Sequence, residues 1–293
     1  MKKILIATDF SEPAENAANY ALALATALKA DLLLCNAFKV PADVPMAAQV
    51  AWPLMDYDAI KKEVSSKLET LAKELTERSA LEGPQSHHPK IEYESELGTV
   101  CEVVTNLVNQ RKIDLVVMGL SGAGALTKFI LGSSSKEMIE KASFPVLFIP
   151  FSAHYKEIRK IVFTTDLNEG DLEYIQFLTT LVNYLSPEIL IAHITNKEVD
   201  QKDKMQRKID AFLNNVVSEI KYPHIKYEYV WNIDVGSGLE YITEQDDINL
   251  VAIVHHRHHL LGKIFKGSYT QKLSRHTELP LLVFPPFEHI ING

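Results

Sequence analysis

A segment rich in glycine and serine, late in the first half of the chain, carries residue types that bind phosphate. It follows the apolar run Leu115–Met118. Its spacing is Gly119-x2-Gly122-x9-Gly132-Ser133, and Ser134 and Ser135 follow. Glycine lets backbone N–H groups come close to a ligand, and a helix N-terminus offers unpaired donors to an anion. The serine hydroxyls add donors, so the spacing predicts a phosphate site that needs no lysine.

Other readings of this segment stay open. It has no Gly-Lys-Ser/Thr ending, so it is not the common phosphate loop. It follows a late strand instead of opening the first β-α-β unit, so it is not a dinucleotide fingerprint. The glycines can alternatively be strand-exit turns, and Ser133, Ser134 and Ser135 can serve only as helix N-caps.

The second half of the chain has a different polar cluster, His255-His256-Arg257-His258-His259. Imidazole suits zinc, copper or nickel, so His255, His256, His258 and His259 are candidate metal ligands. However, adjacent residues often point in different directions, and the run contains no carboxylate or cysteine. Protonated histidines beside Arg257 can instead attract an anion or sense pH. A solvated polar loop is the simplest interpretation, and no metal site is predicted.

The elements that position the first motif are alternating strands and helices. Apolar runs predict strands at Ile4–Thr8, Asp31–Ala37, Ile91–Glu94, Leu115–Gly119 and Val146–Pro150. Helix-period segments predict helices at Glu12–Lys29, Asp56–Glu82, Thr99–Gln110 and Ser133–Ala142. Ser11 is an N-cap candidate, and Pro13 stands where a first helical turn tolerates proline. This alternation predicts a parallel sheet covered on both faces, which binds ligands beyond its strand C-terminal ends.

The chain repeats itself on the scale of a whole domain. Lys2–Glu12 reappears as Arg159–Glu169, a constant 157 residues later. Ile113–Val117 reappears as Ile248–Ala252, now 135 residues later. We therefore predict two domains, residues 1–150 and 157–293, with a short linker between them.

Composition narrows the class of protein. With 293 residues, 46% of them hydrophobic, the chain can build two ordinary cores. A formal net charge of −8 disfavours nucleic acid and anionic membranes as partners. Cys35 and Cys101 lack the spacing of a metal site or a disulfide scaffold, and the N-terminus reaches Asp9 too soon for a signal peptide. We expect a cytoplasmic protein.

Three segments of the first half occur in an order that is characteristic of a known family. They are Ala7-Thr8-Asp9-Phe10-Ser11-Glu12, the glycine–serine motif, and Phe144-Pro145-Val146-Leu147-Phe148. The combination resembles the ATP-binding branch of the universal stress protein family, and the resemblance covers essentially the whole chain as two copies. It implies an α/β fold with two tandem, doubly wound parallel-sheet domains, Rossmann-like and similar to adenine nucleotide α-hydrolases. Family members commonly pair through their last strands, so we expect an internal pseudo-dimer. A homodimer of the chain is a further alternative.

The resemblance also implies nucleotide-binding positions in the first domain. Asp9 should lie beside the nucleotide, although it can instead be a turn or capping carboxylate. The segment from Asn36 to Phe38 matches the family segment whose backbone reads the adenine edge. Asn36 replaces a histidine often found there, and His193 has that place in the second copy. The implied site residues are Ala7, Thr8, Asp9, Asn36, Ala37, Phe38, Met118, Gly119, Gly122, Gly132, Ser133 and Ser134.

The second copy has lost part of the motif. Val254 and Arg257 replace the two loop glycines, whereas Gly267 and Ser268 are kept. A β-branched side chain stands where a ligand should approach the backbone, which predicts a closed nucleotide site in the second domain.

For function, we expect ATP, ADP or AMP in the first domain, with Mg²⁺ as a companion that Asp9 can help to hold. The protein would act as a regulatory or stress-response binding protein with an unidentified protein partner. Two alternatives stay open. One is a slow ATP hydrolase. The other is a scaffold with a vestigial nucleotide site, whose second domain binds another small ligand or a metal.

Overall fold

A computed structural model of the chain describes residues 2–39, 53–120, 132–168, 170–195, 202–231, 235–245, 247–254 and 279–285. These residues form two compact units, of which the first reaches Phe151 and the second begins at Ser152. Gly122, Gly267, Ser268 and the cluster His255–His259 lie outside the described residues. What the sequence predicts for them stays a prediction.

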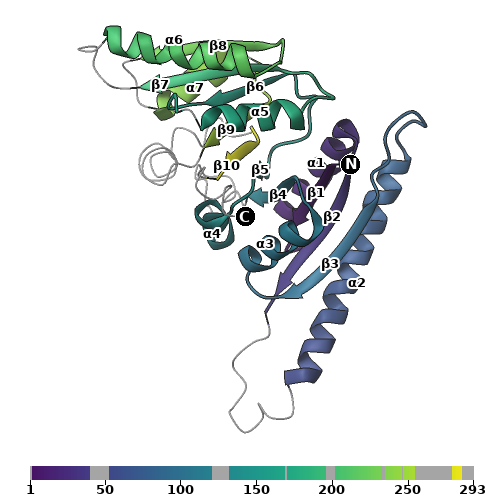
Figure 1. Cartoon of the computed structure of the whole chain (residues 1–293). Helices are drawn as coiled ribbons and strands as arrows, with labels where there is room; N and C mark the ends of the chain where they lie inside the picture. Colours follow the sequence, from purple (N-terminus) through teal and green to yellow (C-terminus); the bar gives the residue numbers. More distant parts are fainter. Residues whose placement is uncertain are drawn as a thin grey trace. The chain divides into compact units, whose positions relative to one another are not determined.

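The first unit is a parallel sheet with helices between its strands (Figure 1). Its elements are β1 (Lys2–Ala7), α1 (Glu12–Leu28), β2 (Ala30–Phe38), α2 (Pro53–Ala80), β3 (Ile91–Leu97), α3 (Val100–Arg111), β4 (Leu115–Leu120), α4 (Ser133–Lys141) and β5 (Val146–Pro150). The strand order is β3-β2-β1-β4-β5, and every neighbouring pair is parallel. The predicted α/β fold is confirmed.

Helices cover both faces of this sheet. Helices α1 and α2 contact each other, as do α3 and α4. Right-handed crossovers place these two pairs on opposite faces, because the chain moves outward from β1 to β3 and then returns to β4. The central strands are therefore buried on both sides, and residues such as Leu5 and Val116 have no exposed surface. The order of strands reverses between β1 and β4, which is where such sheets form a ligand crevice.

The second unit repeats this topology. Its described elements are β6 (Lys160–Thr164), α5 (Asp171–Leu181), β7 (Glu188–Thr195), α6 (Lys202–Glu219), β8 (Ile225–Trp231), α7 (Val235–Gln245), β9 (Leu250–Val254) and β10 (Leu281–Phe284). The order is β10-β9-β6-β7-β8, again with parallel neighbours. In the parts of the chain that the structure describes, no helix is both long and apolar enough to cross a membrane.

One hydrogen bond shows that the two units match residue by residue. In the first unit the backbone N–H of Lys3 donates to Asp114 Oδ2 over 2.8 Å. In the second unit the backbone N–H of Lys160 donates to Asn249 Oδ1 over 2.9 Å. These pairs are related by the same spacings, 157 and 135 residues, that the sequence repeat shows. The repeat therefore reflects a shared three-dimensional arrangement.

Acid should weaken the first unit through Glu92 on its edge strand. Lys3 Nζ and Lys90 Nζ each donate to the Glu92 carboxylate over 2.6 Å, and these bonds lower its pKa to about 2. Because this pKa lies below the unfolded value, the stabilisation is present above about pH 4.3 and is lost as the pH falls toward 2.

We therefore expect Glu92→Gln to lower the Tm by about 2–4 °C near pH 7, a loss of about 1 kcal/mol at this partly exposed site. The difference from the wild type should shrink as the carboxylate is protonated. Thermal unfolding followed by circular dichroism at several pH values measures this. Glu77→Gln is the control, because Glu77 is exposed and lies 3.9 Å from Lys73. An equal Tm difference at about pH 7 and about pH 2 would contradict the assignment.

Candidate functional site

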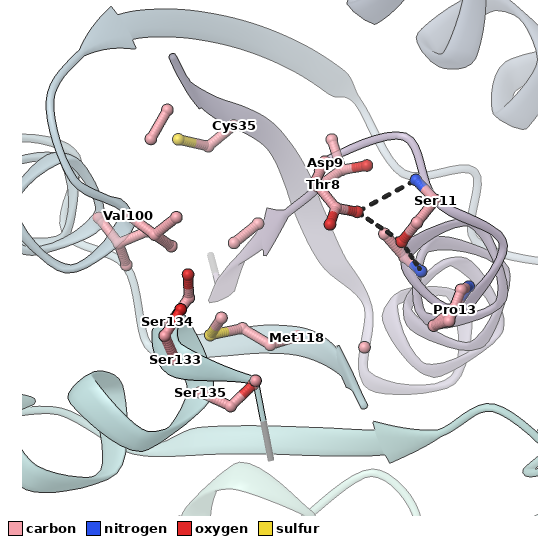
Figure 2. A pocket seen from close by; sticks show the side chains of 16 residues that line it. Thr8, Asp9, Ser11, Pro13, Cys35, Val100, Met118, Ser133, Ser134 and Ser135 are labelled. Carbon is pink, nitrogen blue, oxygen red and sulfur yellow. Dashed lines mark hydrogen bonds between the residues drawn. The ribbon is translucent and has the colours of Figure 1, made fainter. Parts of the chain in front are cut away.

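A cavity of about 260 Å³ lies at the carboxyl ends of β1, β2 and β4 in the first unit (Figure 2). This is just below the usual range for small-molecule pockets, roughly 300–1,000 Å³. Its lining comes from the ends of the three strands and from the first turns of α1, α3 and α4. The lining residues are Ala7, Thr8, Asp9, Ser11, Pro13, Ala14, Cys35, Ala37, Val100, Val104, Met118, Gly119, Gly132, Ser133, Ser134 and Ser135.

Most of the residues expected at a nucleotide site meet at this cavity. They are Ala7, Thr8, Asp9, Ala37, Met118, Gly119, Gly132, Ser133 and Ser134. Asn36 and Phe38 are not among its lining residues. Both are buried, and the Phe38 ring instead packs against Tyr57, with 5.7 Å between ring centroids. The segments that meet are far apart in sequence, which is what the switch point of a doubly wound sheet brings together.

Strand geometry explains which residues of β2 line the cavity. Successive side chains of a strand point to opposite faces, so Cys35 and Ala37 share one face while Asn36 and Phe38 share the other. Cys35, Val100 and Val104 were not expected from the sequence. Two sequence patterns could have predicted these residues. Side chains alternate between faces along β2, which places Cys35 with Ala37, and the i, i+4 spacing places the two valines on one face of α3. Burial raises the pKa of the Cys35 thiol to about 12, so it is a neutral part of the wall.

A tight turn leads from β1 to α1 and places Asp9 beside the cavity. The Thr8 N–H donates to the Cys35 carbonyl over 2.9 Å, and Thr8 Oγ1 accepts from the Phe10 N–H over 3.0 Å. Phe10 has a φ of 63°, which is rare for a bulky residue. The second unit has the same turn. Thr165 Oγ1 accepts from the Leu167 N–H over 2.8 Å, and Leu167 has a φ of 59°.

The side chain of Asn36 holds this turn to the sheet. Asn36 Nδ2 donates to the Thr8 carbonyl over 2.7 Å. In the second unit His193 Nδ1 lies 2.8 Å from the Thr165 carbonyl. A carbonyl oxygen can only accept, so Nδ1 carries the proton. The pairing of Asn36 with His193 in the repeat is thus matched by an equivalent bond, which fixes the backbone of the turn in both units.

The Asp9 carboxylate takes part in the local structure of the turn. Asp9 Oδ1 accepts from the backbone N–H of Ser11 over 3.0 Å and from the Ser11 hydroxyl over 2.5 Å. Figure 2 shows these bonds on one side of the cavity, with Ser133 and Ser134 on another side. Asp9 is exposed and lines the cavity. Asp9 therefore acts as a turn carboxylate, and it also lies where it can contact a ligand in the cavity.

The helices α1 and α4 both begin at the cavity, but their N-termini differ. At α1, Ser11 Oγ accepts from the Ala14 N–H over 3.4 Å, Pro13 has no N–H, and two glutamates stand in the first turn. At α4, the N-cap is Gly132, no side chain caps the helix, and the first turn has no acidic residue. Among the described residues, no side chain caps the first turn of α4, where Ser133, Ser134 and Ser135 carry backbone donors. Of the two helices, α4 has the N-terminus that suits an anion.

Gly119 has a structural reason to lack a side chain. A Cβ at this position would lie 2.4 Å from the Pro13 carbonyl oxygen and 3.0 Å from the Ala14 nitrogen. The end of β4 thus packs directly against the first turn of α1. The φ of Gly119 lies outside the left-handed region. The φ of Gly132, −57°, does so too. In the second unit, where Val254 replaces Gly119, α5 begins only at Asp171, the counterpart of Ala14.

The described residues contain no group of three or more histidine, cysteine, aspartate or glutamate side chains arranged to hold a metal ion. The histidines of the second-domain cluster lie outside that part of the chain.

Both the sequence and the fold are similar to those of known proteins. The model of the universal stress protein family matches residues 1–150. A universal stress protein of Thermus aquaticus is 32% identical over 148 residues, which cover 50% of this chain and 98% of the relative. One from Methanocaldococcus jannaschii is 28% identical over 148 residues, which are 50% of this chain and 81% of the relative. The crystal structure of a universal stress protein from Archaeoglobus fulgidus has a TM-score of 0.70 and 14% identity, and covers 97% of this chain and 98% of its own. That similarity shows a shared tandem fold.

Proposed function

Since the chain belongs to the universal stress protein family, we propose that its first unit binds an adenine nucleotide (ATP, ADP or AMP) and that the protein acts by binding in regulation or stress response. The observation that supports this most directly is the N-terminus of α4 at the wall of the cavity, which no side chain of the described residues caps. Backbone donors and the hydroxyls of Ser133 and Ser134 can surround a phosphate group there.

The difference between the N-termini of α1 and α4 indicates how the nucleotide is oriented in the cavity. The phosphate belongs at α4, where the donors and the helix dipole favour negative charge. The Asp9 and Ser11 side of the cavity carries a carboxylate and suits the uncharged part of the molecule, a sugar or a base. Val100, Val104 and Met118 supply apolar surface to the wall of the cavity. The cavity thus pairs polar contacts with an apolar wall, as small-molecule sites usually do.

The fit of Mg²⁺ is poorer than that of the nucleotide. Asp9 is the one carboxylate among the described lining residues, and its Oδ1 already accepts two bonds from Ser11. Magnesium in nucleotide sites is usually held by one or two carboxylates together with the phosphates. We therefore propose no step that passes through the metal. The hydroxyls and backbone donors of the cavity bind phosphate without activating a nucleophile, which favours binding over catalysis.

Released ligand and a titration series test this function. The purified protein is denatured and the supernatant analysed for adenine nucleotides by chromatography. The refolded or freshly purified chain is then titrated with ATP, ADP, AMP and adenosine by calorimetry. We expect AMP to bind at least about tenfold more tightly than adenosine, because a charge-assisted bond to phosphate contributes about 1.5–3 kcal/mol. Absence of released nucleotide, together with no heat of binding at millimolar concentration, would refute the proposal.

A further inference from the structure

The two units share the turn at the end of their first strand but differ in what faces its threonine. Thr8 and Thr165 each donate their backbone N–H to the second strand, accept a bond at the carbonyl from Asn36 or His193, and accept at Oγ1 from the residue two positions on. This common set of bonds makes the surroundings of the two hydroxyls comparable.

The difference lies at one position of the following helix. In the first unit it is Ala14, which lines the cavity. In the second unit it is Asp171, whose side chain is fully buried. The Thr165 hydroxyl donates to Asp171 Oδ2 over 2.6 Å. Thr8 also lines the cavity, and within the described part of the chain its hydroxyl has one bond, which it accepts from the Phe10 N–H. Its proton is therefore available to an acceptor inside the cavity.

We propose that Asp171 fills, in the second unit, the place that a ligand acceptor occupies beside Thr8 in the first. Ala14 is then the residue that keeps the first site open, and an aspartate at its counterpart closes the second site with the protein's own carboxylate. This rests on the proposed nucleotide binding of the first unit. The ligand group beside Thr8 accepts from the hydroxyl and lies near the Asp9 carboxylate. A group that both donates and accepts fits, such as a sugar hydroxyl or the edge of a purine.

The buried carboxylate also explains why the second unit should reject a nucleotide. The Asp171 carboxylate takes the place of the sugar or base group and already accepts the Thr165 proton, so that part of a nucleotide would find neither room nor a donor there. Asp171 lies in the first turn of α5, together with Glu173, where the helix dipole favours negative charge. In the second unit, carboxylates of the protein itself thus supply the negative charge that the N-terminus of α5 favours.

Replacing Ala14 by aspartate tests the proposal in the full-length chain. We expect Ala14→Asp to fold, with an unchanged circular dichroism spectrum, and to bind AMP at least about 30-fold more weakly than the wild type. Ala80→Asp is the control, since Ala80 is exposed at the end of α2 and is not among the residues that line the cavity, and it should bind within about threefold of the wild type. Affinity of a folded Ala14→Asp variant within about threefold of the wild type would overturn the proposal. If the wild type itself binds no nucleotide, the proposed function fails instead.

A second measurement applies whether or not Ala14→Asp folds. The single variants Thr165→Val and Asp171→Ala and their double variant form a double-mutant cycle in thermal unfolding. If Asp171 acts as the internal acceptor for Thr165, the losses in Tm are not additive, and the double variant melts close to the more affected single variant. Additive losses would show that the two side chains do not depend on each other, and the proposal would be overturned.

Discussion

Replacing Gly119 by valine is expected to unfold the first unit at moderate temperature. The new Cβ would lie 2.4 Å from the Pro13 carbonyl oxygen, 2.7 Å from its carbon and 3.0 Å from the Ala14 nitrogen. These are backbone atoms at the start of α1, so no side chain can rotate away to make room. Overpacking typically costs about 1–3 kcal/mol, and a clash with fixed backbone atoms belongs at the upper end, about 3 kcal/mol. A loss of that size lowers the Tm by roughly 6–12 °C in a domain of about 150 residues.

Differential scanning calorimetry of the full chain measures this effect. Gly83→Val is the matched control, because the same substitution at Gly83 meets nothing within 4 Å and needs no unusual φ. A Gly119→Val protein that melts within about 2 °C of the wild type would show that the helix can shift away from the strand. The result also bears on ligand studies, because loss of nucleotide binding in this variant would not identify Gly119 as a ligand contact.

Replacing Ser134 by aspartate is expected to raise the stability of the free protein and to abolish nucleotide binding. A carboxylate in the first turn of α4 accepts from the free donors and interacts favourably with the helix dipole, at about 0.3–1 kcal/mol. The present first turn has no acidic residue. The same carboxylate would occupy and repel the place of the phosphate. We expect affinity for AMP to fall at least about 100-fold, which corresponds to about 2.7 kcal/mol.

The opposite signs of these two effects make the variant informative. Calorimetric titration gives the affinity, and thermal unfolding without ligand gives the stability. Ser134→Asn has a similar size without the charge and should lose much less affinity. Lys136→Glu, at an exposed position further along α4, adds an acidic residue away from the cavity. If Ser134→Asp bound AMP as well as the wild type does, the phosphate would not lie at this helix.

Much of the fold could be predicted from the sequence, because its signals are local. The strand Val146–Pro150 has the predicted ends, and α1 begins at Glu12 after the expected N-cap, Ser11. The edge strand β3 extends to Leu97, beyond the predicted end at Glu94. Its polar residues, including Ser95 and Glu96, do not read as a strand, and pairing with β2 up to Phe38 keeps them in the sheet. Pairing with β2, and not the strand propensity of these residues, thus determines where β3 ends.

The candidate site was partly predictable for the same reason. Strand ends such as Thr8 and Met118, and the helix start at Gly132, follow from topology and from residue type. The orientation of Asn36 could not be predicted. Consecutive side chains of a strand point to opposite faces of the sheet, and the sequence alone did not show which face holds the cavity. The close approach of β4 to α1 at Gly119 was also invisible, since it depends on how a helix and a strand from distant parts of the chain pack.

The left-handed turn at Phe10 and Leu167 has a practical consequence for mutational surveys. Both units keep the turn and the threonine that stabilises it, although only the first has a described cavity beside it. A survey scored by protein abundance should therefore find both threonines intolerant of change, and Thr165 more so because its hydroxyl also donates to the buried Asp171. A survey scored by ligand occupancy should separate them and report only Thr8. The comparison of the two scores along the duplicated chain would distinguish residues that maintain the architecture from residues that also recognise the ligand.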